Sequence, residues 1–388
     1  MIKRDLESKL KAMAAKMPAV SVMGPRQSGK TTLAKKVFPN YKYVNLEHIP
    51  TRVLIQKDPE GFLDSVTKGV IIDEAQHIPE LFSYLQVAID NNRKPGRFIL
   101  TGSQNYLLME SISQSLAGRI GILNLLPLSI SELENAKQLP SSVDKLVWNG
   151  SYPGIYSTKI SPEDFYPSYI STYLERDVRQ LKNVSNLRTF RSFIALLAGR
   201  TGQLINLSEI GASLGVDHKT VSSWISILEA SFIIFLLRPY HNNFKKRIIK
   251  APKIYFHDTG LVCSLLGIDH ASQFASHWAK GSIFENLIIS DLVKMISNKG
   301  KVPNLFFFRD STGNEVDLLI EQAGHLKIIE IKSGRTFHPD FLKDIYKFRA
   351  LSDLSASNCF VVYDGHLEQK TKEGNILNWR NIGSILNG

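Results

Sequence analysis

The stretch Gly24-Pro25-Arg26-Gln27-Ser28-Gly29-Lys30-Thr31 decides the fold of this 388-residue chain. Its spacing matches the pattern G-x-x-x-x-G-K-[ST], in which backbone N–H groups surround phosphates. The apolar residues 19–23 before it predict a buried strand, and residues 32–38 after it predict a helix that stops at Pro39. A loop between a strand and a helix N-terminus directs N–H groups and the helix dipole at one anion. The stretch therefore predicts a phosphate-binding loop, or P-loop.

The residues of this loop have separate expected roles toward a nucleotide. Lys30 is expected to reach the β- and γ-phosphates of a nucleoside triphosphate, and Thr31 is expected to bind Mg²⁺. A chance glycine-rich turn is the alternative, and the predicted strand and helix on either side argue against it. We therefore expect ATP and Mg²⁺ as ligands. The residues expected to surround the nucleotide are Gly24, Pro25, Arg26, Gln27, Ser28, Gly29, Lys30, Thr31 and Thr32.

Four more apolar runs follow the loop and predict buried strands of a parallel sheet. They cover residues 41–46, 69–74, 97–103 and 121–126. Helical patterns lie between them, such as the one at 79–90, which begins with a proline at a helix-start position. Strands that alternate with helices predict a doubly wound α/β domain.

The run Val70-Ile71-Ile72-Asp73-Glu74 places two acidic residues at the end of a predicted strand. Asp73 is expected to orient the Mg²⁺ shell, and Glu74 is placed to polarise the attacking water. Such a pair after three aliphatic residues is common by chance, but its position after a P-loop makes it informative. The pair predicts ATP hydrolysis in addition to ATP binding.

Three further polar residues are candidates for contact with the nucleotide. Ser103 and Gln104 close the predicted strand at 97–103 and are placed to sense the γ-phosphate, although a plain turn explains either one equally well. Arg119 precedes the last predicted strand and is a candidate arginine finger, acting in its own subunit or on a neighbouring one. An ordinary surface arginine is the other interpretation.

Several motifs occur in a characteristic order along the chain. They lie at 24–32, 72–76, 100–104, 116–119, 126–129 with Glu132 just beyond, 150–153 and 172–178. With these motifs the chain resembles the AAA+-type prokaryotic ATPases that carry a C-terminal domain of unknown function. The resemblance implies an AAA+-like fold more than a biological role. It leaves open whether the protein is a homo-oligomer, as ring-forming relatives are, or a monomer.

Composition limits the class of protein. Hydrophobic residues make up 43% and charged residues 21% of the chain, which is typical of a globular protein. The most apolar stretch, 231–237, is too short to span a membrane, and the first residues lack an apolar signal core. Two cysteines exclude a disulfide framework, so a cytoplasmic location is expected by default. The net charge of +11 permits nucleic-acid binding without requiring it.

The middle of the chain predicts helices followed by a small winged-helix fold. Two short helices, at 207–217 and 218–229, meet at a glycine-bearing turn that is typical of a helix-turn-helix. Runs at 232–239 and 253–257 predict the strands of a wing, with a basic cluster between them. The second helix offers few base-reading side chains, so sequence-specific DNA readout is expected to be weak. DNA binding through the wing and a purely structural winged helix both remain open.

The last hundred or so residues carry a second set of charged residues. A predicted helix containing Glu285 precedes three predicted strands, with Asp317 on the second and Glu330 and Lys332 on the third; a helix and a strand follow. This order resembles the restriction-endonuclease-like PD-(D/E)xK fold, although Val316 stands where that motif usually has proline.

The resemblance implies roles for these residues. Alternation along a strand places Glu330 and Lys332 on one face. Asp317 on the neighbouring strand then converges with Glu330, and with Glu285 from the helix, to bind Mg²⁺. Lys332 is expected to orient or activate a water that attacks a phosphodiester. Surface carboxylates without a metal are the alternative.

The sequence as a whole predicts an α/β protein of three parts. A P-loop NTPase (AAA+-like) domain at 1–145 precedes a helical and winged-helix region at 146–270 and an α/β restriction-endonuclease-like domain at 271–388. ATP hydrolysis is expected to control DNA binding or processing by the last domain. The alternative is a nucleotide-switched regulatory or scaffolding protein whose nuclease-like module only binds.

Overall fold

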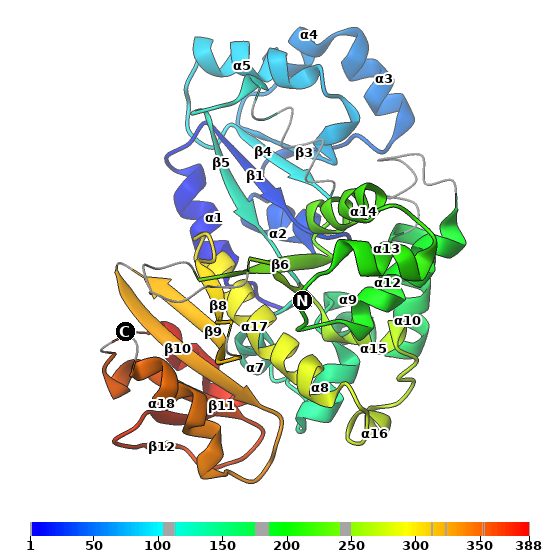
Figure 1. Ribbon diagram of the computed structural model, residues 1–388. Helices are drawn as coiled ribbons and strands as arrows, with labels where there is room; N and C mark the ends of the chain where they lie inside the picture. Colours follow the sequence, from blue (N-terminus) through cyan, green and yellow to red (C-terminus); the bar gives the residue numbers. More distant parts are fainter. Residues whose placement is uncertain are drawn as a thin grey trace.

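We describe a computed structural model of the chain, in which two β-sheets are joined by a layer of helices (Figure 1). The N-terminal sheet is drawn in blue and cyan, and most of the C-terminal sheet is drawn in orange and red. The middle helices are drawn in green. The structure describes residues 2–103, 112, 114–174, 186–240, 250–311, 313–322, 324–350, 352 and 354–387.

The N-terminal sheet has five strands in the order β2-β3-β4-β1-β5, and its neighbouring strands run parallel. The predicted parallel α/β sheet is therefore confirmed. Because the strands are parallel, the loops after β1, β3 and β4 leave the sheet at one edge. The strands are β1 (Ala19–Met23), β2 (Lys42–Asn45), β3 (Val70–Asp73), β4 (Phe98–Gly102) and β5 (Ile120–Asn124).

Helices cover both faces of this sheet, as expected for strands that are buried on both sides. Leu6 and Leu10 of α1 and Leu33 of α2 pack with Val20 and Val22 on one face. On the other face, α5 packs in the large core that also holds Ile72 and Leu100. The helices are α1 (Leu6–Ala14), α2 (Lys30–Val37), α3 (Ile49–Lys57), α4 (Pro59–Asp64) and α5 (Leu81–Asn91), with a 3₁₀ turn η1 (Ala75–His77) after β3.

The middle of the chain is helical, and capping residues mark the starts of two of its helices, α13 and α14. Asn206 caps α13 by accepting from the Glu209 amide, and Asp217 caps α14 by accepting from the Thr220 amide. Gly215 between them has a φ of +67°, which favours glycine. The elements are α7 (Ile130–Asn135), α8 (Val143–Asn149), α9 (Pro153–Thr158), α10 (Pro162–Tyr169), η2 (Ile170–Leu174), α12 (Leu187–Gly199), α13 (Leu207–Leu214), α14 (His218–Ala230), α15 (Thr259–Leu265) and α16 (Ala271–Phe274).

The C-terminal sheet has eight strands in the order β12-β13-β11-β10-β9-β8-β6-β7. The two strands predicted as a wing, β6 and β7, pair with each other antiparallel, and β6 also pairs parallel with β8. The sheet therefore continues from the last region into the middle one. The strands are β6 (Ile234–Pro239), β7 (Lys253–Phe256), β8 (Leu305–Arg309), β9 (Glu315–Gln322), β10 (His325–Lys332), β11 (Cys359–Tyr363), β12 (Gln369–Lys370) and β13 (Asn375–Asn378).

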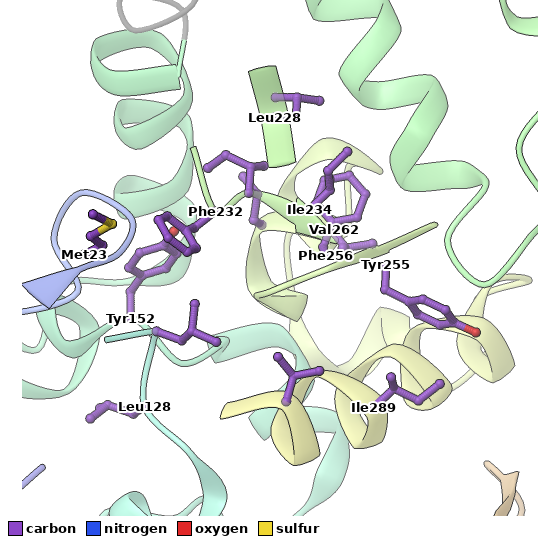
Figure 2. Packing of buried hydrophobic residues seen from close by; sticks show 14 of the residues in the cluster. Met23, Leu128, Tyr152, Leu228, Phe232, Ile234, Tyr255, Phe256, Val262 and Ile289 are labelled. Carbon is purple, nitrogen blue, oxygen red and sulfur yellow. The ribbon is translucent and has the colours of Figure 1, made fainter. Parts of the chain in front are cut away.

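Two long-range packing features join the regions. The 19-residue helix α17 (Lys280–Asn298) contacts α1, α8, β5, β7 and β10. One apolar cluster runs from Met23 at the end of β1 through Tyr152 and Phe256 to Ile289 on α17 (Figure 2). The remaining elements are η3 (Pro339–Leu342), α18 (Lys343–Arg349), η4 (Ala356–Asn358) and η5 (Trp379–Leu386).

His257, directly after β7, makes the stability of this core dependent on pH. Its ring lies against Phe235 with centroids 4.8 Å apart. Burial, with the Lys294 ammonium as a second cause, lowers the pKa of His257 to about 3. Because the folded pKa is lowered, the stabilisation is complete above the unfolded pKa of about 6.5 and is lost as pH falls toward 3.

We expect His257 to lower the free energy of unfolding by about 2 kcal/mol at pH 5 relative to pH 8, because the histidine takes up a proton on unfolding at pH 5. Urea unfolding of the wild type and of His257→Phe at both pH values measures the effect. On acidification from pH 8 to pH 5, the free energy of unfolding of His257→Phe should fall by about 2 kcal/mol less than that of the wild type, because both proteins share all other titrating groups. Equal losses would show that His257 is protonated in the folded state.

Candidate functional site

The P-loop leaves the sheet at the end of β1 in a conformation that depends on glycine. Gly24 has a φ of +153°, and a Cβ there would lie 2.1 Å from the backbone oxygen of Leu125. Gly29 has a φ of +93° and is the N-cap residue of α2, which begins at Lys30. The loop therefore turns tightly enough for its amides and the start of α2 to face one point.

Lys30 extends back over the loop from the first turn of α2. Its ammonium donates to the backbone oxygens of Gly24, at 2.9 Å, and of Pro25, at 2.8 Å. The side chain is buried, with only 5% of the residue exposed. A buried ammonium that is held by loop carbonyls is positioned to exchange them for phosphate oxygens, which are stronger acceptors.

Asp73 ends β3 beside the start of α2. Its carboxylate accepts from the Thr31 hydroxyl at 2.8 Å, from the Tyr43 hydroxyl at 2.7 Å and from the Thr101 hydroxyl. The structure thus brings Thr31 and Asp73 together, as the sequence predicted. A hydroxyl and a carboxylate beside a phosphate-binding loop are the oxygen donors that suit Mg²⁺.

Glu74 follows β3 in a left-handed conformation with a φ of +54°, which is unusual for a residue other than glycine. Its carboxylate accepts from the Gln76 amide group at 2.6 Å and from the Ser103 hydroxyl at 3.0 Å. Burial alone would raise the pKa of Glu74, but the Lys30 charge, these hydrogen bonds and the Arg26 charge together lower it. Glu74 is therefore an ionised, oriented carboxylate next to the P-loop lysine.

The remaining predicted nucleotide contacts differ in their placement. Ser103 lies in the site but donates to Glu74. Gln27, at the tip of the loop, has a φ of +61°, and the Arg26 guanidinium lies 3.6 Å from the Glu47 carboxylate. Thr32 is exposed on α2. Gln104 lies outside the described residues.

Arg119 does not lie near the P-loop of its own chain. Its backbone oxygen accepts from the amide of Ala19, so it sits at the start of β1, at the opposite edge of the sheet from Gly24. Five strand residues separate the two edges, about 16 Å at 3.3 Å per residue. The guanidinium makes two 2.8 Å hydrogen bonds to Asp90. The predicted role in cis is not supported by this placement, because the side chain starts too far from the phosphates.

A residue far from the motif, Arg4, supports the P-loop from behind. Its guanidinium donates to the backbone oxygens of Ser28 and Leu126, both at 2.6 Å, and to the Glu132 carboxylate at 2.9 Å. A cavity of about 130 Å³ beside it is lined by Ile2, Arg4, Ser28, Gly29, Thr32, Leu33, Lys36, Leu128, Pro153 and Ser157. Arg4 and Tyr43 could not be predicted from the sequence, because they reach the site only through the fold. Gln76 and Thr101 lie inside the motifs at 72–76 and 100–104, but no role was expected of them.

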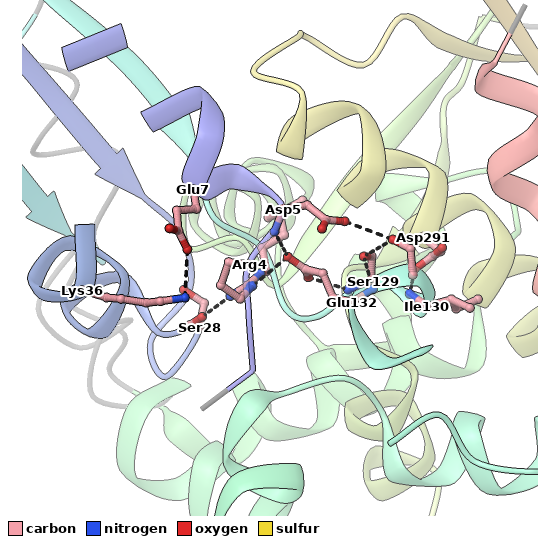
Figure 3. A network of polar contacts seen from close by, with 11 residues as sticks. Arg4, Asp5, Glu7, Ser28, Lys36, Ser129, Ile130, Glu132 and Asp291 are labelled. Atoms are coloured by element: carbon pink, nitrogen blue, oxygen red, sulfur yellow. Dashed lines mark hydrogen bonds and ion pairs between the residues drawn. The ribbon is translucent and has the colours of Figure 1, made fainter. Parts of the chain in front are cut away.

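The polar network around Arg4 continues to helix α17 (Figure 3). Glu132 also accepts from the Ser129 amide at 2.9 Å, in the capping box of α7. The next amide, of Ile130, donates to Asp291 of α17 at 2.8 Å. Arg4, Glu132 and Asp291 are all buried. The P-loop and α17 are thus joined through the first turn of α7.

The predicted residues of the C-terminal site lie on β9, β10 and α17. Lys332 donates to Glu330 at 2.7 Å and lies 3.5 Å from Asp317, so its ammonium bridges the two carboxylates. The backbone amide of Ile331 donates to Asp317 at 2.8 Å. Glu330 is 1% exposed, and its Oε1 atom has no hydrogen-bond partner among the described residues. Burial and the nearby Asp317 charge raise the pKa of Glu330 well above its usual range.

Glu285 has different neighbours from those predicted. Its carboxylate accepts from the Tyr255 hydroxyl and lies 3.4 Å from the Lys253 ammonium, both from β7. Burial raises the pKa of Glu285 to about 7, although Lys253 acts in the opposite direction. Sequence reasoning missed Lys253 and Tyr255, because they belong to a different region of the chain.

Within the described residues, no three His, Cys, Asp or Glu side chains are grouped closely enough to hold a metal ion together. The structure therefore does not assemble the predicted set of Glu285, Asp317 and Glu330. Asp317 and Glu330, bridged by Lys332, remain a pair of carboxylates suited to Mg²⁺, which is commonly bound by one or two carboxylates with waters. The unpartnered Oε1 of buried Glu330 is an observation that favours this pair.

Family models match three consecutive parts of the chain. An AAA domain matches residues 16–134, a domain of unknown function (DUF8612) matches 140–272, and another (DUF4143) matches 280–382. The sheet, the P-loop and these matches define an α/β protein with an AAA-type P-loop ATPase domain. No helix within the described residues is long and apolar enough to cross a membrane.

The chain is 31% identical to the uncharacterized protein Rv2008c of Mycobacterium tuberculosis over 367 residues, which cover 94% of this chain and 80% of the relative. It therefore belongs to the same family as Rv2008c. An uncharacterized protein of Haemophilus influenzae is 24% identical over 308 residues, covering 70% of this chain and 74% of that protein.

Solved structures show partial likeness to this chain. The Walker-type ATPase PABY2304 of Pyrococcus abyssi covers 68% of this chain and 96% of its own, at 15% identity and a TM-score of 0.47. DnaA of Aquifex aeolicus, bound to AMPPCP, covers 58% of this chain and 85% of its own, at 13% identity and a TM-score of 0.30. Such likenesses say nothing of this chain's activity.

Proposed function

We propose that this protein hydrolyses ATP with Mg²⁺ at the P-loop. The observation that carries the proposal is the meeting of Lys30, Thr31, Asp73 and Glu74 at one sheet edge. Lys30 and the loop amides bind phosphate, and Thr31 and Asp73 hold Mg²⁺, which supplies charge stabilisation when bound. Glu74, kept ionised and oriented by Ser103 and Gln76, accepts a proton from the attacking water.

The cavity beside Arg4 and Thr32 is the proposed location of the nucleoside end of ATP. It adjoins the P-loop at Ser28 and Gly29 and is lined mainly by apolar atoms from Ile2, Leu33, Leu128 and Pro153. The flat base of ATP fits such a lining, while the phosphates of ATP extend toward Lys30. Arg119, on the other edge of the sheet, is proposed to act only on a neighbouring subunit of a homo-oligomer.

The C-terminal region is proposed to bind or process DNA under control of the nucleotide. Support for a winged helix comes from α13, α14 and the antiparallel pair β6 and β7. Support for a nuclease-like module comes from Asp317, Glu330 and Lys332 on adjacent strands. The buried contacts from the P-loop through Arg4 and Glu132 to Asp291 offer a physical connection between the two sites.

A nuclease at this site should depend on Lys332. We expect Mn²⁺- or Mg²⁺-dependent cleavage of linear, branched or single-stranded DNA by the wild type, and no cleavage by Lys332→Ala, because the lysine orients the attacking water. Lys343→Ala, at an exposed lysine of α18, is the matched control. Gel analysis that shows no cleavage by the wild type, or equal cleavage by Lys332→Ala, would exclude this activity.

The second candidate is a nucleotide-switched scaffold whose nuclease-like module only binds. The internal bridge that Lys332 makes between Asp317 and Glu330 favours it, because that bridge already pairs both carboxylates. Stimulation of ATP turnover by DNA separates the candidates. A DNA-processing protein should turn over ATP faster with DNA, whereas the scaffold should be indifferent to it.

A further inference from the structure

Lys253, the first residue of β7, is a buried cation that comes from outside the nuclease-like region. Its side chain is 4% exposed, and its ammonium lies 2.5 Å from Glu315 and 3.4 Å from Glu285. The ring of Phe307 closes the site, with its centroid 5.4 Å from the ammonium. Such a lysine is held in place, because its departure would leave the largely buried Glu285 carboxylate without a cationic partner.

Tyr255 secures Glu285 from the same strand. It stands two residues after Lys253, so both side chains project from one face of β7. Its hydroxyl donates to Glu285. The Glu285 carboxylate therefore has two partners on β7. Strand β7 is not a neighbour of β10, because β9, β8 and β6 lie between them in the sheet.

Glu330 and Asp317 lie at the other end of this acidic cluster. Lys332 pairs with Oε2 of Glu330, while Oε1 of Glu330 is buried and has no partner in the part of the chain that the structure describes. An oxygen of this kind loses its hydration without a replacement, which is costly unless a ligand binds there. A ligand for this oxygen would therefore lie next to Asp317 and not next to Glu285.

The pairing within the cluster shows where a further cation can bind. Lys253 lies between Glu285 and Glu315, and Lys332 lies between Asp317 and Glu330. Burial raises the pKa values of Glu285 and Glu330, so a metal ion that binds to Glu330 would displace its proton. Lys253 already holds the place beside Glu285, which leaves Asp317 and Glu330 as the pair open to a divalent cation.

We propose that Lys253 is a built-in cation that replaces a metal ion at Glu285, so the site takes a single divalent cation at Asp317 and Glu330. Glu285 is then a partner of Lys253 and not a metal ligand. This inference rests on the proposed metal-binding function of the C-terminal site. It makes β7, from the middle region, a structural part of that site, with Lys253 as a positioning residue.

Counting bound Mn²⁺ by electron paramagnetic resonance, with the full chain and no nucleotide, tests the proposal without any activity assay. Every protein in this experiment, including the one called wild type, carries Asp73→Asn, which removes the proposed metal ligand at the P-loop. We expect one Mn²⁺ in the wild type. Glu285→Gln should bind it with an affinity within about threefold of wild type. Glu330→Gln and Asp317→Asn should weaken binding by more than the roughly 10- to 100-fold that loss of a hydrogen-bond partner of a metal ligand causes, because both are proposed as ligands.

Two results would overturn the role of Lys253 while leaving the metal site standing: two Mn²⁺ ions in the wild type, or an equal loss of affinity in Glu285→Gln and Asp317→Asn. Absence of any bound Mn²⁺ in the wild type would overturn the metal site itself and the inference with it.

Two substitutions of Lys253 test its role as a cation. Lys253→Arg keeps the charge and should keep one ion. Lys253→Met should gain a second ion, and folding of each variant is checked by circular dichroism.

Discussion

Replacing Glu74 by glutamine should leave ATP binding intact and slow its hydrolysis about 10²- to 10⁴-fold, the range typical of a lost general base. Glutamine keeps the shape of the side chain and can still meet Ser103 and Gln76. It cannot take a proton from water, and it lacks the negative charge that faces Lys30. Binding of a fluorescent ATP analogue and release of phosphate, each measured with Mg²⁺, separate the two effects.

The matched variant for this experiment is Lys30→Ala, which should lose nucleotide binding itself. The Lys30 ammonium is buried and donates to the backbone oxygens of Gly24 and Pro25, and alanine can make neither hydrogen bond. Hydrolysis by Glu74→Gln at the wild-type rate would show that another group activates the water. Tight binding by Lys30→Ala would place the nucleotide elsewhere.

Replacing Arg4 by methionine should destabilise the protein by about 3–5 kcal/mol, because it leaves the buried Glu132 carboxylate without its charged partner. The same change removes two hydrogen bonds to the backbone oxygens of Ser28 and Leu126. We therefore expect weaker ATP binding in addition to lower stability. Urea unfolding and nucleotide titration measure the two effects.

Lys11→Met is the control for Arg4, since Lys11 makes an exposed ion pair with Glu7 at 2.9 Å. Exposed pairs of this kind contribute at most about 1 kcal/mol. If Arg4→Met lowers stability no more than Lys11→Met does, the buried network is not important for the fold. If stability falls but ATP affinity is unchanged, Arg4 supports the core and not the P-loop.

Local signals were sufficient to predict the nucleotide site. The strand, the glycine loop and the helix around Lys30 are consecutive in sequence, and their chemistry requires that order. Asp73 and Glu74 were expected in this site because they end an apolar run that follows a P-loop. The pairing of β1 with β4 and β5, and of β3 with β4, bears out the predicted parallel sheet.

Contacts between distant segments could not be predicted in the same way. Arg4 lies 128 positions from Glu132, and nothing local marks it as a partner of the P-loop. Lys253 reaches Glu285 because β6 and β7 extend the C-terminal sheet, a pairing with no short-range signal. Arg119 has a suggestive position in the sequence, but only the sheet register shows which edge it occupies.

The most direct test of the account is phosphate release from ATP by the purified full chain, measured with and without Mg²⁺ and with and without DNA. We predict turnover that requires Mg²⁺, rises when DNA is added and is absent in Lys30→Ala. Phosphate release no greater than that of Lys30→Ala under every condition would contradict the proposal that this P-loop hydrolyses ATP.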